Sequence, residues 1–404
     1  MKIEISPSKA KGSVNAPASK SMAHRLLICA AMAEGKSVVS GVSDCQDVSA
    51  TLDCLSALGV EYSKNGEEIT VRGKHLGEES LSPAMPLMCR ESGSTLRFFL
   101  PIALLSKDRI TLEGAPSLLK RPMTVYEELC KQNGLLFLQE ESGITVQGPL
   151  QSGTYEIPGN VSSQFITGML FALTQIKGES LLRITPPIES RSYILLTLAA
   201  LREFGADVSW ENDTTLRVRG GKSLTAHATR VEGDYSNAAF LEALNLFGGE
   251  VDVLGLRADS LQGDRVYRSL FAALEEKEPV ISLADCPDLA PILFAVSAAK
   301  HGGIFTDTKR LKIKESDRTE TMAEELRKFG AAVTVKENSV EIRTSGLNAP
   351  KEPINGHNDH RIVMSNAVLL TLTGGSIEGA EAVSKSYPAF FSHLKELGIA
   401  VKEL

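Results

Sequence analysis

The sequence has no long apolar run. No stretch of its 404 residues approaches the ~18 apolar residues of a membrane-spanning helix. The two longest candidates, residues 165–176 and 289–299, are shorter and are interrupted by glycine or serine. Residues 1–7 also lack the apolar core of a signal peptide. A membrane or secreted protein is therefore disfavoured, and we expect a cytoplasmic one.

Cysteine and histidine are few and lack the spacings of metal or redox sites. The six cysteines include no C-x-x-C pair, so we expect free, mostly buried thiols. Among the seven histidines, His357 and His360 lie three residues apart, but no H-E-x-x-H motif surrounds them. Neither a structural nor a catalytic metal is expected.

Nucleotide-binding loops and an overall basic charge are missing as well. The chain has neither G-x-G-x-x-G nor G-x-x-x-x-G-K-[ST]. Its net charge of -7 argues against nucleic acid as a partner. Any anionic ligand must therefore be attracted by local groups of lysine and arginine. With 43% hydrophobic and 23% charged residues, the chain is typical of soluble globular proteins of two or three domains.

The sequence does contain a repeated motif. In each copy we expect a helix that ends in an apolar residue and glycine and is followed by a strand hairpin. Glycine suits the left-handed position after a helix, and Asn65-Gly66 is a strong hairpin signal. The glycines lie 75, 71, 125 and 68 residues apart, so the gap of 125 predicts one degenerate copy, which we place near residues 274–280. The helix-ending glycines are Gly59, Gly134, Gly205, Gly330 and Gly398.

This repetition predicts an α/β fold of six βαβαββ units with two helices each. Residues 231–234 form a reasonable domain boundary that leaves three units on each side. The alternative is that helices of α/β proteins often end in glycine without any true repeat. First helices are expected near Ser19, Ser92, Ser162, Ser236, Pro287 and Asn358, and second helices near Asp47, Pro122, Ser192, Ser260, Ser316 and Ser386.

Lysine and arginine recur at these expected helix starts. Residues 314–318 place two cations and two acids within five positions, and Ser21 and Arg25 share one helical face. Free N–H groups and the helix dipole add to the positive charge there. Taken singly, each start could be a capped helix with solvated charges; taken together, they predict one cationic cleft for a small polyanion. The cations are Lys20, Arg25, Arg97, Arg121, Lys314, Arg318 and Arg361, with Lys385 at one more helix start.

Other helix starts carry uncharged or acidic groups. Ser162, Ser163 and Gln164 could cradle a phosphate, or could simply be an N-cap with one idle serine. Gly93 would let a ligand approach the backbone closely. Asp288 fits either a base that accepts a hydroxyl proton or an acid stabilised by the helix dipole.

Taken together in their order along the chain, these helix-start motifs resemble the EPSP synthase family of enolpyruvyl transferases over the whole chain. The resemblance implies two lobes of three βαβαββ units, residues 19–231 and residues 232–404 with 1–18, and an active site between them. Two residues, Glu91 and Phe98, differ from the common pattern of the family. The matching stretches are Lys20-Ser21-x-x-x-Arg25, residues 93–97, Lys120-Arg121-Pro122, Ser162-Ser163-Gln164, Pro287-Asp288, residues 314–318, Asn358-Asp359-His360-Arg361 and Lys385-x-x-Pro388.

The resemblance also implies the reaction and its ligands. Phosphoenolpyruvate and shikimate 3-phosphate would give an enolpyruvyl ether and phosphate, with no cofactor, metal, nucleic acid or membrane, in a protein expected to be a monomer. For shikimate 3-phosphate the resemblance assigns Lys20, Ser21, Arg25, Ser162, Ser163, Gln164, Ser190, Tyr193, Asp288 and Lys314. For phosphoenolpyruvate it assigns Lys20, Gly93, Arg121, Gln164, Arg318, Arg361 and Lys385.

The chemistry implied is an addition followed by an elimination. Glu315 is the expected acid and base at the methylene carbon, and Asp288 the base at the attacking hydroxyl, while Lys20 or His360 would assist the leaving phosphate. A placed acid or base contributes about 10²–10⁴ in rate.

Two other functions are disfavoured by the sequence. The sister enzyme that acts on UDP-N-acetylglucosamine has a reactive cysteine before an Arg-Pro pair, whereas residues 113–122 contain none. A non-catalytic scaffold that binds an anionic metabolite is disfavoured because Asp288 and Glu315 stand among cations, where pure anion binding would avoid carboxylates.

Overall fold

The computed structural model describes residues 1–77, 81, 83 and 85–404, and the chain forms two compact units. Unit 1 comprises Met1–Pro17 and Gly233–Leu404, and unit 2 comprises Ala18–Glu232. Each unit has its own continuous apolar core. The N-terminal segment belongs to unit 1 because its two strands pair with strands from the C-terminal half.

Unit 2 contains three sheets with one common pattern, in which two parallel strands continue into an antiparallel hairpin. The first sheet has the order β10 (Thr154–Pro158), β11 (Gly178–Thr185), β13 (Thr215–Gly220) and β12 (Asp207–Asn212). The second has the order β6 (Leu87–Met88), β7 (Ile110–Glu113), β9 (Gly143–Gln147) and β8 (Leu136–Gln139). The third has the order β14 (Leu224–Thr225), β3 (Ala33–Ser40), β5 (Glu68–Gly73) and β4 (Glu61–Asn65), with β15 (Ala228–Arg230) also on β3.

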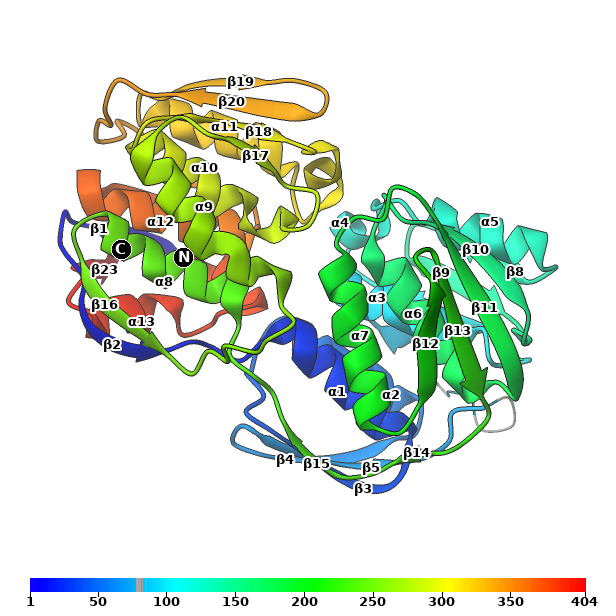
Figure 1. Ribbon diagram of the computed structural model, residues 1–404. Helices are drawn as coiled ribbons and strands as arrows, with labels where there is room; N and C mark the ends of the chain where they lie inside the picture. The colour runs from blue at the N-terminus through cyan, green and yellow to red at the C-terminus, as the bar shows by residue number, and fades with distance from the viewer. Residues whose placement is uncertain (78–80, 82, 84) are drawn as a thin grey trace. The chain divides into compact units, whose positions relative to one another are not determined.

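Helices fill the inside of unit 2 while the sheets lie outside (Figure 1). Helix α3 packs on α6, and α1 packs on α7 and α2. The helices α1, α3 and α6 are buried over most of their length, as expected of helices that are apolar on all sides. The helices are α1 (Lys20–Met32), α2 (Gln46–Ala57), α3 (Gly93–Ala103), α4 (Pro116–Leu119), α5 (Thr124–Gln132), α6 (Ser163–Gln175) and α7 (Arg191–Glu203).

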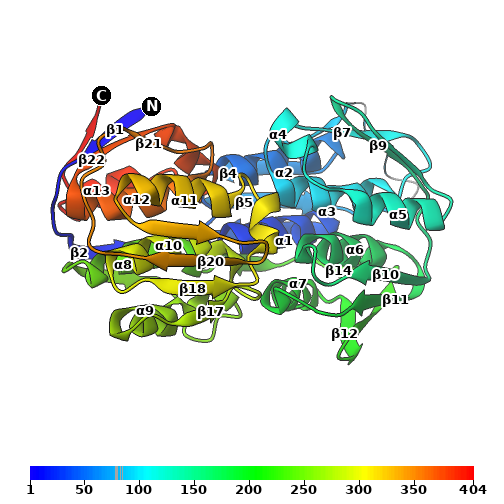
Figure 2. The same ribbon diagram turned by 90° about the horizontal axis from the view of Figure 1, so that it is seen from above.

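Unit 1 repeats this plan, with α8, α10 and α12 packed together at its centre. Figure 2 shows β18 and β20 running beside α10. Its sheets are β17 (Val280–Ser282), β18 (Gly303–Thr306), β20 (Ser339–Arg343) and β19 (Ala332–Val335); β21 (Ile354–Asn355), β22 (Gly375–Glu378), β1 (Lys2–Ile5) and β23 (Val401–Glu403); and β16 (Glu250–Leu254) with β2 (Lys11–Asn15). Its helices are α8 (Tyr235–Leu246), α9 (Tyr267–Glu276), α10 (Ala290–Ala299), α11 (Arg318–Lys328), α12 (His360–Thr373) and α13 (Phe390–Glu396), with 3-10 turns η1 (Gly263–Val266), η2 (Pro287–Leu289), η3 (Lys309–Ile313) and η4 (Ala380–Lys385).

The α/β fold built from βαβαββ repeats is confirmed, although not every repeat has a full sheet of its own: the sheet of β16 and β2 has only two strands. The repeats that carry β6–β9, β10–β13 and β17–β20 are complete. The first repeat takes its parallel strands from β14 and β15, and the last completes its sheet with β1. The expected hairpin near residues 274–280 was wrong, because α9 runs to Glu276 and leads through Pro279 directly into β17.

Helix starts were predicted well where a side chain caps the helix. Ser19, Ser92 and Ser162 accept hydrogen bonds from the first turns of α1, α3 and α6. The starts placed near Ser260 and Ser386 were wrong, since α9 begins at Tyr267 and α13 at Phe390. The chain instead passes through η1 before α9, and through η4 and Pro388 before α13. Among the described residues, no helix combines the length and apolar character needed to cross a membrane.

All six cysteines are buried and none forms a disulfide, as the sequence predicted. Burial raises the pKa of the Cys45 thiol to about 11 and that of Cys130 to about 12. These two thiols are therefore protonated at neutral pH and act as small apolar side chains of the core.

Candidate active site

In unit 1, Asp288 is surrounded by three cations. It lies in η2, and its carboxylate is 3.1 Å from Lys314 Nζ, 3.1 Å from Arg318 Nη1 and 3.2 Å from Arg361 Nη2. Burial alone would raise the pKa of Asp288, but Arg361, Lys314 and Arg318 hold it well below its usual range. Asp288 is therefore ionised at neutral pH.

Arg318 is the centre of this group, which we call the Asp288 cluster (Asp288, Lys314, Glu315, Arg318, Asp359 and Arg361). Its guanidinium is buried and donates to Glu315 Oε2 at 2.7 Å and to Asp359 Oδ2 at 2.8 Å, as well as to Asp288. Burial lowers the pKa of Arg318, but the carboxylates of Asp359, Glu315 and Asp288 raise it overall. Arg318 is thus a permanent cation with fixed orientation.

Helix starts bring these residues together. Arg318 is the first residue of α11 and Arg361 the second of α12, while η2 leads into α10. Asp359 caps α12 by accepting the Arg361 N–H at 2.9 Å, and it also binds Arg318. The packing of α10 against α11 and α12 therefore gathers charges that lie far apart in the sequence.

His360 and Lys385 lie near the same helix start. His360 is the first residue of α12, and its buried Nδ1 is 3.8 Å from Asp359 Oδ1. Lys385 Nζ donates to the carbonyl of Asn358 at 2.7 Å. The expectation that Lys385 begins a helix was wrong, because it is the last residue of η4.

In unit 2, Arg25 reaches from α1 to the start of α7. It donates to Thr197 Oγ1 at 2.9 Å, to the Tyr193 carbonyl at 3.1 Å and to the Ser21 carbonyl at 2.6 Å. Its guanidinium also lies 5.5 Å from the centre of the Phe98 ring. Burial lowers the pKa of Arg25 to about 10, so it remains charged at neutral pH.

A second group of unit 2 residues surrounds the start of α3. Arg97 Nη1 donates to Gln164 Oε1 at 2.7 Å, and Gln164 Nε2 donates to Ser94 Oγ at 2.9 Å. A Cβ atom at Gly93 would lie 2.7 Å from Arg121 Nη1, closer than real Cβ contacts allow. The absence of a side chain at Gly93 therefore lets the Arg121 guanidinium lie over this helix start.

Lys20 and the predicted serines lie at the starts of α1, α6 and α7 in unit 2. Lys20 Nζ lies 2.8 Å from Asp47 Oδ2, and both side chains are largely buried. Ser162 caps α6 by accepting the Gln164 N–H at 3.3 Å, and Ser163 is the first helical residue. Ser190 stands before α7 in the left-handed conformation with φ of 54°.

Sequence reasoning brought out the cations but missed several of their partners. Asp359 was noted only as a member of the Asn358-Asp359-His360-Arg361 motif, and Asp47 only as a helix start, although both also form ion pairs. The role of Thr197 as a partner of Arg25 was not predicted, because the two residues lie 172 positions apart in the sequence. Phe98 was noted as a departure from the family pattern, and it packs edge-on against His24.

Comparisons with known proteins extend over the whole chain. Two similar curated proteins are the 3-phosphoshikimate 1-carboxyvinyltransferases of Clostridium kluyveri, 36% identical over 99% of this chain and 98% of that protein, and of Clostridium perfringens (strain ATCC 13124), 35% identical over 99% of each. The EPSP synthase of Acinetobacter baumannii has a similar structure, with a TM-score of 0.79, 25% identity and full coverage of both chains.

A second solved structure shows the fold alone. The enolpyruvyl transferase NikO from Streptomyces tendae has a TM-score of 0.77 at 14% identity, over 99% of this chain and 98% of that one.

The family model described as EPSP synthase (3-phosphoshikimate 1-carboxyvinyltransferase) matches residues 5–394. The chain therefore belongs to the EPSP synthase family.

Proposed function

We propose that the protein transfers the enolpyruvyl group of phosphoenolpyruvate to the 5-hydroxyl of shikimate 3-phosphate. The products are 5-enolpyruvylshikimate 3-phosphate and phosphate, an intermediate and a by-product of aromatic amino acid biosynthesis. Family membership over residues 5–394 supports the reaction. The observation that carries it is Asp288, ionised and held by three cations.

Shikimate 3-phosphate is assigned mainly to unit 2. Ser162, Ser163 and Ser190 bind its phosphate through hydroxyls and the N-terminus of α6. Ser21 and Arg25 bind its carboxylate, and Tyr193 borders the ring. This role for Arg25 is supported by its buried, permanently charged guanidinium. Further contacts of this substrate are assigned to Lys20, Gln164, Asp288 and Lys314.

Phosphoenolpyruvate is assigned to residues of both units. Arg318 and Arg361 clamp its carboxylate, for which the planar guanidinium fork is well suited. Its phosphate is assigned to Lys20, Arg121 and Lys385. The close approach that Gly93 allows and the amide of Gln164 complete the set.

The reaction proceeds by addition and then elimination. Asp288 takes the proton of the 5-hydroxyl as its oxygen bonds to the central carbon of the enol, while Glu315 protonates the methylene carbon. In the tetrahedral intermediate, the carbon–oxygen bond to phosphate then breaks, phosphate leaves with the electron pair, and Glu315 removes a proton from the methyl group. Lys20 or His360 stabilises the departing phosphate.

Substrate charge helps Asp288 act as a base. Its pKa is depressed by Arg361, Lys314 and Arg318, so it is a weak base in the unbound protein. A carboxylate bound to Arg318 and Arg361 offsets their positive charge and raises the pKa of Asp288. Asp288 is therefore most basic when phosphoenolpyruvate is present.

The cellular location and the oligomeric state of the protein are also part of the proposal. We place the protein in the cytoplasm as a monomer. Six buried cysteines without a disulfide support a reducing compartment. Light scattering of the purified chain at the mass of 43.5 kDa would support the monomer, and a twofold mass would contradict it.

The test is phosphate release by the purified protein with both substrates. We expect release only when phosphoenolpyruvate and shikimate 3-phosphate are both present, together with an enolpyruvyl ether detectable by NMR. UDP-N-acetylglucosamine in place of shikimate 3-phosphate should give none. A folded protein, shown by a cooperative thermal melt, that releases no phosphate with the correct pair overturns the proposal.

A further inference from the structure

One face of α11 holds both ends of the loop that precedes α12. Residues seven positions apart lie on the same face of a helix, and Arg318 and Glu325 have this spacing. Arg318 binds Asp359 at one end of the 355–359 loop, and Glu325 accepts the Asn355 N–H at 3.0 Å at the other. The helix that supplies a cation to the Asp288 cluster thus also positions this loop.

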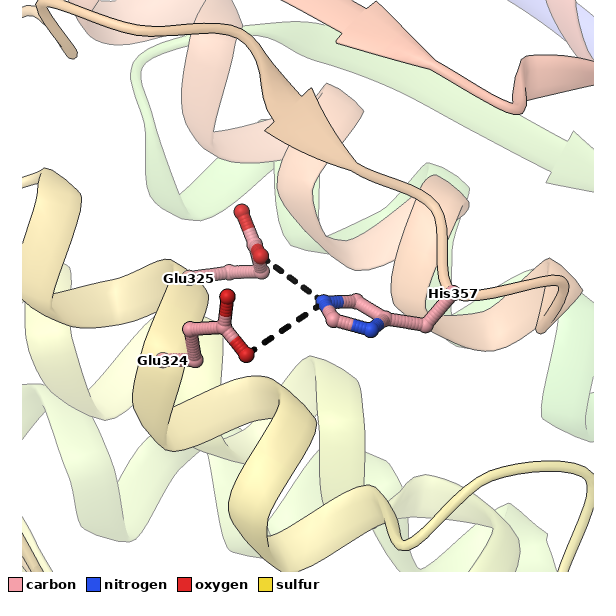
Figure 3. A group of neighbouring side chains, drawn as sticks. All are labelled: Glu324, Glu325 and His357. Atoms are coloured by element: carbon pink, nitrogen blue, oxygen red, sulfur yellow. Dashed lines mark hydrogen bonds and ion pairs between the residues drawn. The ribbon is translucent and has the colours of Figure 1, made fainter.

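Glu325 makes an unusually complete set of contacts for a glutamate. Its carboxylate is fully buried; Oε1 lies 2.8 Å from His357 Nε2, and Oε2 lies 2.8 Å from Lys328 Nζ (Figure 3 shows the histidine contact). Burial would raise the pKa of Glu325, but hydrogen bonds from His357, Lys328 and the Asn355 N–H lower it overall. Glu325 is therefore a permanent buried anion, fixed by its three partners.

The group of Glu324, Glu325 and His357 has the spacing of a metal site, with ligand atoms within 4.8 Å of one another. The Lys328 ammonium on Glu325 opposes a cation there, because it already supplies the positive charge. Glu324 is 59% exposed and only reaches 3.9 Å from His357 Nε2. The contacts therefore favour a clamp on the loop over a metal centre.

The loop needs such a clamp because its backbone is strained. His357 and Asn358 have φ of 47° and 52°, in the left-handed region that side chains disfavour. Gly356 is also tightly packed, since a Cβ atom there would lie 2.7 Å from Val363 Cγ2. Left-handed turns at two successive residues set the direction of the Asn358 carbonyl, which accepts Lys385 Nζ at 2.7 Å.

We propose that Glu325 is a positioning residue for phosphoenolpyruvate binding. Its carboxylate fixes Asn355 and His357, the fixed loop aims the Asn358 carbonyl, and that carbonyl orients the Lys385 ammonium. This inference rests on the proposed function only in assigning Lys385 to the phosphate of phosphoenolpyruvate. Glu325 itself touches no substrate in this scheme.

The first experiment measures the loop without any substrate. Hydrogen exchange of the backbone amides of residues 355–359 is compared between the natural protein, Glu325→Ala and Glu324→Gln. Loss of the buried carboxylate should speed exchange by about tenfold or more, since it frees the Asn355 N–H. Glu324→Gln is the matched control on the same helix and near the same imidazole, and it should leave exchange unchanged.

The second experiment separates the two substrates. Calorimetry should show Glu325→Ala weakening phosphoenolpyruvate about tenfold to a hundredfold, as misplacement of a binding group does, with shikimate 3-phosphate changed by less than about twofold. Glu325→Gln, whose amide oxygen can still accept the Asn355 N–H, should restore part of the loss. Should Glu325→Ala fail to fold, His357→Ala removes one contact of the clamp and should give the same pattern more weakly.

Each outcome decides the proposal. Equal weakening of both substrates, an unchanged loop in Glu325→Ala, or an equal effect of Glu324→Gln overturns it. If the natural protein shows no enolpyruvyl transfer, the proposed function fails, while the exchange experiment still tests the link between Glu325 and the loop.

Discussion

Arg318 of unit 1 and Arg25 of unit 2 are both buried, but their surroundings are opposite. In unit 1, Arg318 lies within 3.1 Å of the carboxylates of Asp288, Glu315 and Asp359, which raise its pKa. In unit 2, the described partners of Arg25 are hydroxyl and carbonyl oxygens, and burial lowers its pKa to about 10. A buried arginine is thus neutralised by carboxylates in unit 1 and keeps its net charge in unit 2.

This difference suggests a division of labour. A buried arginine held by neutral acceptors keeps its charge for an anionic ligand and binds it with little competition. Arginines held among carboxylates are oriented more firmly, and the carboxylates themselves become available for proton transfer. We therefore expect unit 2 mainly to bind substrate and unit 1 mainly to carry the chemistry.

The largest effect should follow from removing a group that moves or steers protons. Glu315→Gln in unit 1 should keep the fold and lower the rate of phosphate release by about 10²–10⁴, and Lys20→Ala in unit 2 should lose most activity as well. A steady-state assay and a thermal melt measure both. Glu320→Gln, an exposed change in the first turn of α11, is the control. Full activity in Glu315→Gln and Lys20→Ala contradicts the assignment.

A smaller but more selective effect is expected from the serines at α6. Ser162→Ala/Ser163→Ala should weaken shikimate 3-phosphate by about tenfold for each lost hydrogen bond to a charged group, and phosphoenolpyruvate far less. Calorimetry with each ligand separately measures this. Equal losses for the two ligands would remove the proposed division between the units.

The next effect is the response of the Asp288 cluster of unit 1 to acid. The depressed pKa of Asp288 stabilises the fold above the unfolded value of about 3.9, and this contribution disappears as pH falls toward the folded pKa. The melting temperature of the natural protein should therefore fall more between pH 7 and pH 3 than that of Asp288→Asn. The exposed Asp259→Asn is the control and should follow the natural protein closely. Parallel pH profiles for all three proteins would contradict the prediction.

The smallest effect is expected at Gly93. A methyl group at this position meets the flexible end of Arg121 at 2.7 Å, so the guanidinium must move while the backbone stays in place. Gly93→Ala should raise the KM for phosphoenolpyruvate about tenfold and leave that for shikimate 3-phosphate nearly constant. Steady-state kinetics with each substrate varied in turn would reveal an equal change in both, which the proposed assignment does not allow.

Local signals were read correctly from the sequence, and signals that depend on packing were not. The Asn65-Gly66 hairpin and the capped start of α1 require only neighbouring residues, and both are present. The hairpin placed near residues 274–280 required the sheet of β16 and β2 to grow beyond two strands, and it does not. The assignment of Lys385 to a helix start failed because a 3-10 turn uses the same residue types.

Caps, turns and motif spacing depend on neighbouring residues, so the family, the repeated βαβαββ plan and the cations at helix starts could be predicted from the sequence. The acceptor that each cation contacts depends on how the helices pack. Asp288, Arg318 and Arg361 come from three separate segments, and they meet because α10 packs on α11 and α12. Whether an arginine faces carboxylates or hydroxyls, and hence what its charge can do, follows from that packing.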